Sequence, residues 1–227
     1  MALPQIAAAI AAAARTINES TGLDETLTAI AHTARRSVPG FDQVGISTLD
    51  RHGKVHTRAG TGDLVWALDK LQYELWEGPC VDTLSDAPVV VAPRIRDSDR
   101  WPRYVPKAVE AGLKAQLAVK LYLDSTGTIG GLNMYSTQSE EIQPDAESMA
   151  DLFAAHAAIA LGHAEQRQQL NEALHSRKLI GQALGILMER YQLSEDRAFA
   201  FLVRASSHGN VKLRDVAAEL VRGVNER

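Results

Sequence analysis

The chain has 227 residues, of which 45% are hydrophobic and 23% are charged, and its formal net charge is −4. These values are those of an ordinary soluble protein with one or two domains and a hydrophobic core. No uninterrupted apolar run approaches the ~20 residues that span a bilayer, and a single cysteine, Cys80, excludes a disulfide within the chain.

The first 21 residues are rich in alanine and predict a helix. Ile6, Ile10, Ala13 and Ile17 follow one another at steps of four, three and four, which forms a narrow apolar stripe suited to a helix partner. Packing of this stripe on the chain's own domain is an equally good interpretation. The segment has no positive charge ahead of its apolar part, so we expect no signal peptide and a cytoplasmic protein.

The next part of the chain, residues 22–163, predicts an α+β domain. The odd positions of 114–124 are apolar and the even ones mostly polar, which indicates a half-buried strand. Gly130-Gly131 in its partner indicates a bulge or the close approach of another backbone. Strands between flanking helices favour an antiparallel sheet. We expect a helix from 22 to about 38, two strands within 43–60, a helix over 63–76, a loop over 76–86, a strand over 88–93, a short helix within 97–112, and strands over 114–124 and 128–137.

A long helix is expected next, because Pro144 opens a helical pattern that continues to about Tyr191 without an internal proline. It contains a heptad register with a polar middle, which predicts a marginal coiled coil. Its two histidines suggest hydrogen-bonded seam residues or, alternatively, a pH switch. The two seam positions are His156, His163, Leu170, Arg177 and Leu184, and Ile159, Gln166, Ala173, Ile180 and Leu187.

The last quarter of the chain predicts a module of three helices. The first ends near Tyr191, and Ser194 is a suitable N-cap for the second. The apolar face of the second is expected to comprise Ala198, Phe199, Leu202 and Ala205. Asn210 can cap the third helix.

Two segments of this module, IGQALGILMERYQLSEDRAFAFLVRASS and NVKLRDVAAELV, resemble an ANTAR domain, the three-helix RNA-binding module of bacterial transcription antiterminators. The resemblance implies that the module holds paired stem-loops in nascent transcripts, so that a terminator hairpin cannot form. One departure is Leu184, where many family members have Lys. The resemblance covers nearly all of residues 170–222.

The segments LQYELWEGPCVDTL, DRWPRYVPKAVEAGLKAQLAV and IGGLNMYS resemble a GAF domain of the kind fused to ANTAR modules. We therefore divide the chain into an N-terminal helix (1–21), a GAF sensor domain (22–163), a helical connector (164–175) and an ANTAR domain (176–227). The resemblance implies a small-molecule pocket between one face of the sheet and the elements that cover it. It places near that pocket Tyr73, Trp76, Glu77, Cys80, Trp101, Tyr104, Gln116 and Asn133.

The identity of a ligand or cofactor stays unknown from the sequence. The motif of cyclic-nucleotide GAF domains is not visible, and Cys80 does not stand in the motif that attaches a bilin. Sulfoxide reduction by a GAF-type reductase needs a second cysteine, which the chain lacks. Neither a catalytic triad nor a metal-ligand cluster stands out, so we do not expect an enzyme.

Positive charge is concentrated at the C-terminal end, where residues 171–227 hold nine Lys and Arg against seven Asp and Glu. Residues 1–170 hold fifteen against twenty-one. Because nucleic-acid affinity comes largely from neutralised phosphates, one module alone should bind RNA weakly, and we expect a homodimer. The candidate RNA-binding residues are Arg177, Lys178, Arg190, Arg197, Arg204, Asn210, Lys212 and Arg214.

The sequence therefore favours a cytoplasmic antitermination regulator that senses a small signal and binds RNA. Three alternatives remain open. The helical module also fits a DNA-binding transcription factor, Cys80 also fits a redox sensor or small enzyme, and the C-terminal helices also fit a protein partner.

Overall fold

The computed structural model of the protein describes residues 22–50, 52–85, 87–123 and 127–225. The helix expected over residues 1–21 lies outside this part of the chain. By its contacts the chain divides into two compact units, one that ends at Ala164 and one that begins at Glu165. We call them the sheet unit and the helical unit and describe each separately.

A five-stranded antiparallel sheet forms the centre of the sheet unit, in the order β2-β1-β5-β4-β3. The predicted hairpin within residues 43–60 is confirmed, and its second strand, β2, is an edge of the sheet. The register of this hairpin shifts between Ile46 and Ser47. The strands are β1 (Gln43–Leu49), β2 (Val55–Gly60), β3 (Val89–Ala92), β4 (Ala115–Leu123) and β5 (Gly127–Ser136).

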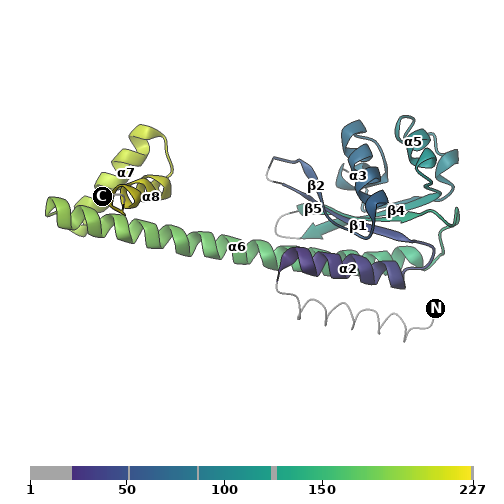
Figure 1. Ribbon diagram of the computed structural model, residues 1–227, viewed down its shortest axis with the longest axis horizontal. Coiled ribbons are helices and arrows are strands. Elements are labelled where there is room, and N and C mark those ends of the chain that lie inside the picture. The colour runs from purple at the N-terminus through teal and green to yellow at the C-terminus, as the bar shows by residue number, and fades with distance from the viewer. Residues whose placement is uncertain (1–21, 51, 86, 124–126, 226–227) are drawn as a thin grey trace. The chain divides into compact units, whose positions relative to one another are not determined.

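Helices cover both faces of the sheet (Figure 1). On one face, α2 (Leu23–Ser37) and the first part of α6 (Ala146–Tyr191) bury the larger apolar core. On the other face lie α3 (Asp63–Leu75) and α5 (Tyr104–Glu110), together with α4 (Pro79–Ser85) and the short 3-10 helix η1 (Ile95–Asp97). The fold class predicted for this region, an antiparallel sheet with flanking helices, is confirmed.

Two details of the sheet test predictions made from the sequence. The prediction of a half-buried strand over 114–124 was wrong: β4 is buried on both faces from Ala115 to Val119, because helices cover both sides of the sheet. The close backbone approach expected at Gly130 is confirmed, since a Cβ at that position would lie 2.0 Å from the carbonyl oxygen of Ser47. A side chain at Gly130 would therefore separate β1 from β5.

The segment expected as a loop over 76–86 contains the helix α4. Pro79 stands at its first position, where the missing backbone N–H costs nothing. The helix has only 7 residues, which is too short for a clear apolar period.

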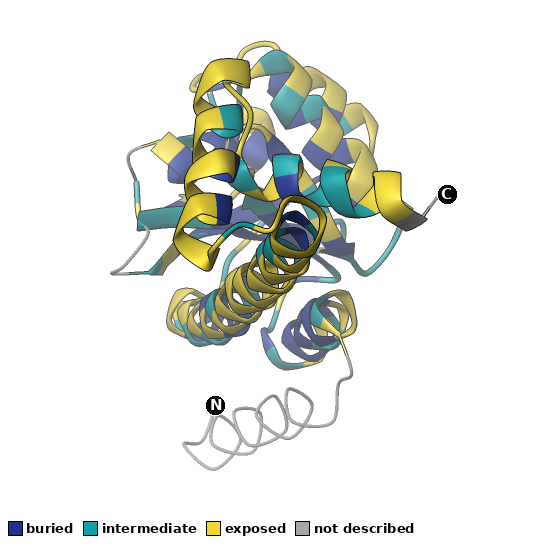
Figure 2. Ribbon diagram, turned by 90° about the vertical axis from the view of Figure 1, so that its left-hand side faces the viewer, coloured by how far each residue is buried: buried dark blue, intermediate teal, exposed yellow. Residues whose placement is uncertain are grey.

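The long helix is confirmed, since α6 continues without interruption for 46 residues. His156 is bonded within it, with Nδ1 2.7 Å from the carbonyl oxygen of Leu152. Every residue from 166 to 175 is exposed (Figure 2), including Leu170 at 61% and Leu174 at 56%. Formation of a coiled coil by this segment stays a prediction.

In the helical unit, the end of α6 packs with α7 (Glu195–Gly209) and α8 (Leu213–Asn225). The three expected helices are confirmed, and Ser194 is the N-cap of α7, although its hydroxyl makes no capping hydrogen bond. Leu184 packs against the core, which consists of Ala183, Leu187, Ala198, Leu202 and Ala217.

Two predictions about this unit were wrong. Phe199 is 44% exposed, because α7 buries Ala198 and Leu202 and turns Phe199 toward one flank. Asn210 does not cap the third helix. It ends α7 in the left-handed conformation, with φ of 48°, which Asn tolerates better than most residues, and α8 begins three positions later.

Candidate functional site

The face of α3 that packs on the sheet carries two polar residues, Asp69 and Gln72, and both are completely buried. The Asp69 carboxylate accepts hydrogen bonds from Tyr135 Oη, from Asn133 Nδ2 at 3.2 Å and from Thr57 Oγ1 at 2.7 Å. These donors come from β2 and β5. A buried carboxylate needs such donors, because it loses its hydration on folding.

Gln72 extends this arrangement toward α4 and β4. Its Nε2 donates to Tyr135 Oη at 3.1 Å, and its Oε1 accepts from Cys80 N at 2.9 Å and Gln116 Nε2 at 3.2 Å. Tyr104 Oη donates to Gln116 Oε1 at 2.7 Å. We refer to these completely buried residues as the Asp69 network: Asp69, Gln72, Tyr104, Gln116, Asn133 and Tyr135.

Burial raises the pKa of Asp69 to about 6, and its hydrogen bonds offset only part of this effect. Sequence reasoning missed Asp69 and Gln72, because polar residues on a helix normally face solvent. Asn133 Oδ1 is the single buried side-chain nitrogen or oxygen atom for which the described part of the chain supplies no hydrogen-bond partner.

Cys80 is completely buried beside the Asp69 network. Its Sγ accepts a hydrogen bond from Asn133 Nδ2 at 3.1 Å and lies 3.7 Å from Ser47 Oγ. Burial, and secondly the charge of Asp69, raise the pKa of the Cys80 thiol to about 12. The reactive form of a cysteine is the thiolate, so this environment disfavours thiol chemistry.

We expect Cys80 to resist alkylation in the folded protein. At pH 8 the thiolate fraction of a group with this pKa is on the order of one in ten thousand, and burial blocks access as well. Intact mass spectrometry after treatment with iodoacetamide should show no adduct in buffer and one adduct in concentrated urea. Stoichiometric alkylation of the folded chain would contradict this and would reopen the redox-sensor alternative.

The other residues expected near a ligand pocket lie around the network. Trp101 is buried, and its indole Nε1 donates to Asp82 Oδ2 at 3.1 Å. The Glu77 carboxylate accepts hydrogen bonds from Arg103 Nε at 2.5 Å and from the backbone N–H groups of Arg103 and Tyr104. It therefore fixes the start of α5. These hydrogen bonds, first of all that from the Arg103 side chain, lower the pKa of Glu77. Cys80, Tyr104, Gln116 and Asn133 occupy the packed interior.

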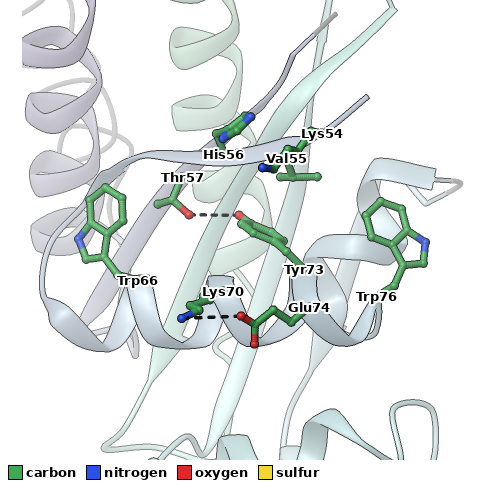
Figure 3. Close-up of a pocket in the computed structure, with 9 residues that line it drawn as sticks. All are labelled: Lys54, Val55, His56, Thr57, Trp66, Lys70, Tyr73, Glu74 and Trp76. Carbon is green, nitrogen blue, oxygen red and sulfur yellow. Dashed lines mark hydrogen bonds and ion pairs between the residues drawn. The ribbon is translucent and has the colours of Figure 1, made fainter. Parts of the chain in front are cut away.

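Tyr73 and Trp76 border an open groove between the edge strand β2 and α3 (Figure 3). Its cavity volume is about 630 Å³. Trp66 and Trp76 stand at opposite ends of the groove with Tyr73 between them, and β2 forms the opposite wall (Figure 3). Sequence reasoning missed the remaining lining residues, which are Lys54, Val55, His56, Thr57, Trp66, Lys70 and Glu74.

All eight residues expected to bind RNA are exposed. They do not form one cluster, since Arg177 and Arg190 on α6 are on the order of 20 Å apart along the helix and on different sides of it. Arg214 is paired with Glu172 at 4.0 Å and Asp215 at 3.5 Å. Within the described residues, the other six cations make no salt bridge.

One flank of α7 combines two of these cations with an aromatic ring. Arg197, Phe201, Arg204 and His208 follow one another at steps of four, three and four, so they share one side of the helix. All four are exposed, Phe201 at 46%. We call them the α7 flank. The sequence prediction placed Phe199 on the buried face of α7 and assigned no role to Phe201, whereas both rings are exposed.

Among the described residues, no three His, Cys, Asp or Glu side chains are grouped so that they could hold a metal ion. Within the same residues, no helix combines the length and the hydropathy that a membrane span requires.

Comparison with solved structures places the fold of the sheet unit. The GAF domain of an Acinetobacter phosphoenolpyruvate-protein phosphotransferase is 17% identical with a TM-score of 0.57, and the alignment covers 74% of this chain and 99% of that one. The corresponding domain from Coxiella burnetii is 14% identical with a TM-score of 0.59, covering 73% and 98%. A free methionine-R-sulfoxide reductase from Neisseria meningitidis is 15% identical with a TM-score of 0.55, covering 71% and 91%. At these identities the likeness shows the fold alone.

Family models give a more specific assignment. A search of curated proteins found no match. A model described as GAF domain matches residues 20–162, and a model described as ANTAR domain matches residues 168–221. The chain therefore belongs to the GAF domain family and joins that domain to a C-terminal ANTAR domain, which makes it a GAF–ANTAR protein.

Proposed function

We propose that this protein is a cytoplasmic transcription antitermination regulator that binds RNA stem-loops through its ANTAR domain under the control of a small molecule bound by its GAF domain. The observation that carries this proposal is the α7 flank within the ANTAR match, where Arg197 and Arg204 are exposed beside Phe201 and form no salt bridge with any described residue.

The chemistry of the α7 flank suits a folded RNA with a loop. Arg197 and Arg204 can contact phosphates, and Phe201 offers a face on which an unstacked loop base can stack. The four side chains extend over about 16 Å of helix. The acidic residues at the start of α7, Glu195 and Asp196, project from other sides of the helix. The flank itself therefore carries only neutral and positive groups.

A homodimer would place two such flanks on one RNA. The exposed stretch of α6 supports this, because Leu170 and Leu174 are 61% and 56% exposed and stand one helical turn apart, so that they form a continuous apolar strip. A second copy of α6 that packs along this stretch would cover both. Linked domains then bind linked hairpins with an effective concentration that a single domain lacks.

A competition experiment separates RNA binding from the DNA-binding alternative. Labelled two-hairpin RNA would be bound by the full chain at low ionic strength and then challenged with unlabelled RNA or with duplex DNA of the same sequence. We expect the RNA to compete at least ~10-fold better, because the α7 flank is suited to loop bases rather than to a groove. Equal competition, or stronger competition by the DNA, would favour a DNA-binding factor.

The cations at the start of α8 are expected to differ in their contributions. Lys212→Ala should weaken RNA binding about fivefold and reduce the salt dependence by about one ion. Arg214→Ala should have a smaller effect, because Arg214 is already paired with Glu172 and Asp215. Fluorescence anisotropy over a salt series measures both effects, and a larger loss for the Arg214 variant would contradict this ranking.

A further inference from the structure

We propose that the groove between β2 and α3 is the sensor's binding site and that its ligand is a small planar aromatic anion, such as an aromatic carboxylate. The inference rests on the proposed sensory function and names the class of molecule that would be sensed. It places the site at the edge of the sheet, beside the packed interior that the Asp69 network fills.

The two ends of the groove are aromatic. Trp66 is 46% exposed and Trp76 is 55% exposed, and both line the groove together with Tyr73 (Figure 3). The Trp66 ring packs closely over Gly60, where a Cβ would lie only 3.0 Å from the indole Nε1. Large aromatic rings left half-exposed around a concave site provide flat apolar surfaces for a planar ligand.

The backbone at Trp76 points to a role beyond folding. Trp76 ends α3 in the left-handed conformation, with φ of 52°. This conformation is unfavourable for a bulky side chain, and Gly or Asn is the usual residue at such a helix end. The fold alone would therefore favour a different residue, whereas a ligand that packs on the indole explains why a tryptophan stands at the rim of the groove.

The charge of the lining selects an anion. Lys54, His56 and Lys70 line the groove. Glu74 Oε1 lies 3.7 Å from Lys70 Nζ, and Asp50 Oδ2 lies 3.1 Å from His56 Nε2. Lys54 makes no salt bridge with any described residue. This one cation without a salt bridge stands out because residues 1–170 carry six more acidic than basic side chains. An anionic ligand would pair with Lys54 and would be attracted to this part of an otherwise acidic domain.

The wall of the groove is already fixed in position. Thr57 Oγ1 donates to buried Asp69 and lies 3.3 Å from Tyr73 Oη, so that both groove residues are tied to the Asp69 network. A cavity of about 630 Å³ accommodates a molecule of two or three fused or linked rings. The site therefore has the volume, the flat apolar walls and the positive charge that one planar anion requires.

Isothermal titration calorimetry of the full chain tests the proposal with 2-naphthoate as the probe and 2-naphthamide as its neutral counterpart. We expect saturable binding of one naphthoate per chain and at least ~10-fold weaker binding of the amide. Trp76→Gly should weaken naphthoate binding at least ~10-fold and leave the thermal midpoint unchanged or higher, because Gly relieves the left-handed backbone. Tyr122→Ala removes an aromatic ring that is also 55% exposed but lies outside the groove, and it should bind like the wild type.

Absence of saturable naphthoate binding at millimolar concentration would overturn the ligand class. Unchanged binding by the Trp76→Gly variant would overturn the site, and equal binding of the amide would overturn the selection for an anion. RNA binding is measured separately on the same preparations. If the wild-type chain binds RNA but not naphthoate, only the ligand inference is rejected. If the wild-type chain does not bind RNA, the proposed function is rejected.

Discussion

Replacing both arginines of the α7 flank, Arg197→Gln with Arg204→Gln, is expected to weaken binding of two-hairpin RNA on the order of 30-fold at low salt. Each arginine contributes about one phosphate contact, so the dependence of log affinity on log salt should fall by about two per chain. The fold should survive, because both side chains are exposed and neither makes a salt bridge with another described residue. Fluorescence anisotropy over a salt series measures the affinity and the slope together.

The matched control for this double variant is a change in charge outside the ANTAR domain. Lys107→Gln removes an exposed cation from α5 of the sheet unit and should leave RNA affinity within about twofold of the wild type. Circular dichroism should show the same helix content in all three proteins. If the double variant binds RNA as tightly as the Lys107 variant, the α7 flank does not contact RNA.

The second large effect concerns the stability of the GAF domain and its dependence on pH. Asp69 has a pKa near 6 in the folded state and an ordinary value near 3.8 when exposed, so between these pH values the folded protein holds a proton that the unfolded chain has lost. The contribution of Asp69 to stability therefore decreases as pH rises from about 4 through 6, and the loss from this group is on the order of 3 kcal/mol. Above that range its contribution is constant.

Asp69→Asn should remove this pH dependence and keep the structure. The amide oxygen can accept from Tyr135 and Asn133, and the amide nitrogen can donate to Thr57, whose hydroxyl then turns toward Tyr73. We expect the variant and the wild type to be similarly stable near pH 4 and the variant to be more stable at pH 7, by up to about 3 kcal/mol.

Urea unfolding at several pH values measures this difference. All three tryptophans, Trp66, Trp76 and Trp101, lie in the GAF domain, so their fluorescence reports the unfolding of that domain without the ANTAR domain. If the free energies of unfolding of the wild type and the variant change with pH in parallel, the pKa of Asp69 does not differ between the folded and unfolded states, and the prediction is wrong.

Periodicity predicted the helices of this protein well, for identifiable reasons. The proline-free pattern up to Tyr191 and the three-residue and four-residue steps around Leu187 and Leu202 are long enough to define a helix and its buried side. Helix α4 was missed because it is a single short segment. At residue 210 the sequence could not distinguish the end of one helix from the start of the next, since Asn suits both positions.

The candidate sites were harder to predict, because they depend on which elements pack together. Asp69 and Gln72 look like surface residues in the sequence, and only the packing of α3 on the sheet buries them. The groove exists because Trp66 and Lys70 on α3 stand opposite His56 on the edge strand β2 and Lys54 just before it. Likewise, Phe199 and Phe201 are two residues apart and so lie on different sides of α7, and only Phe201 stands beside Arg197 and Arg204.

Two ANTAR domains on a dimer are proposed to bind two linked RNA hairpins. Analytical ultracentrifugation of the full chain with RNAs that carry one hairpin or two, at equal total length and low ionic strength, tests it most directly. We expect a complex of two chains with one two-hairpin RNA and an affinity at least ~10-fold above that for the one-hairpin RNA. Equal affinities, or no binding of either RNA with or without a ligand in the groove, would contradict it.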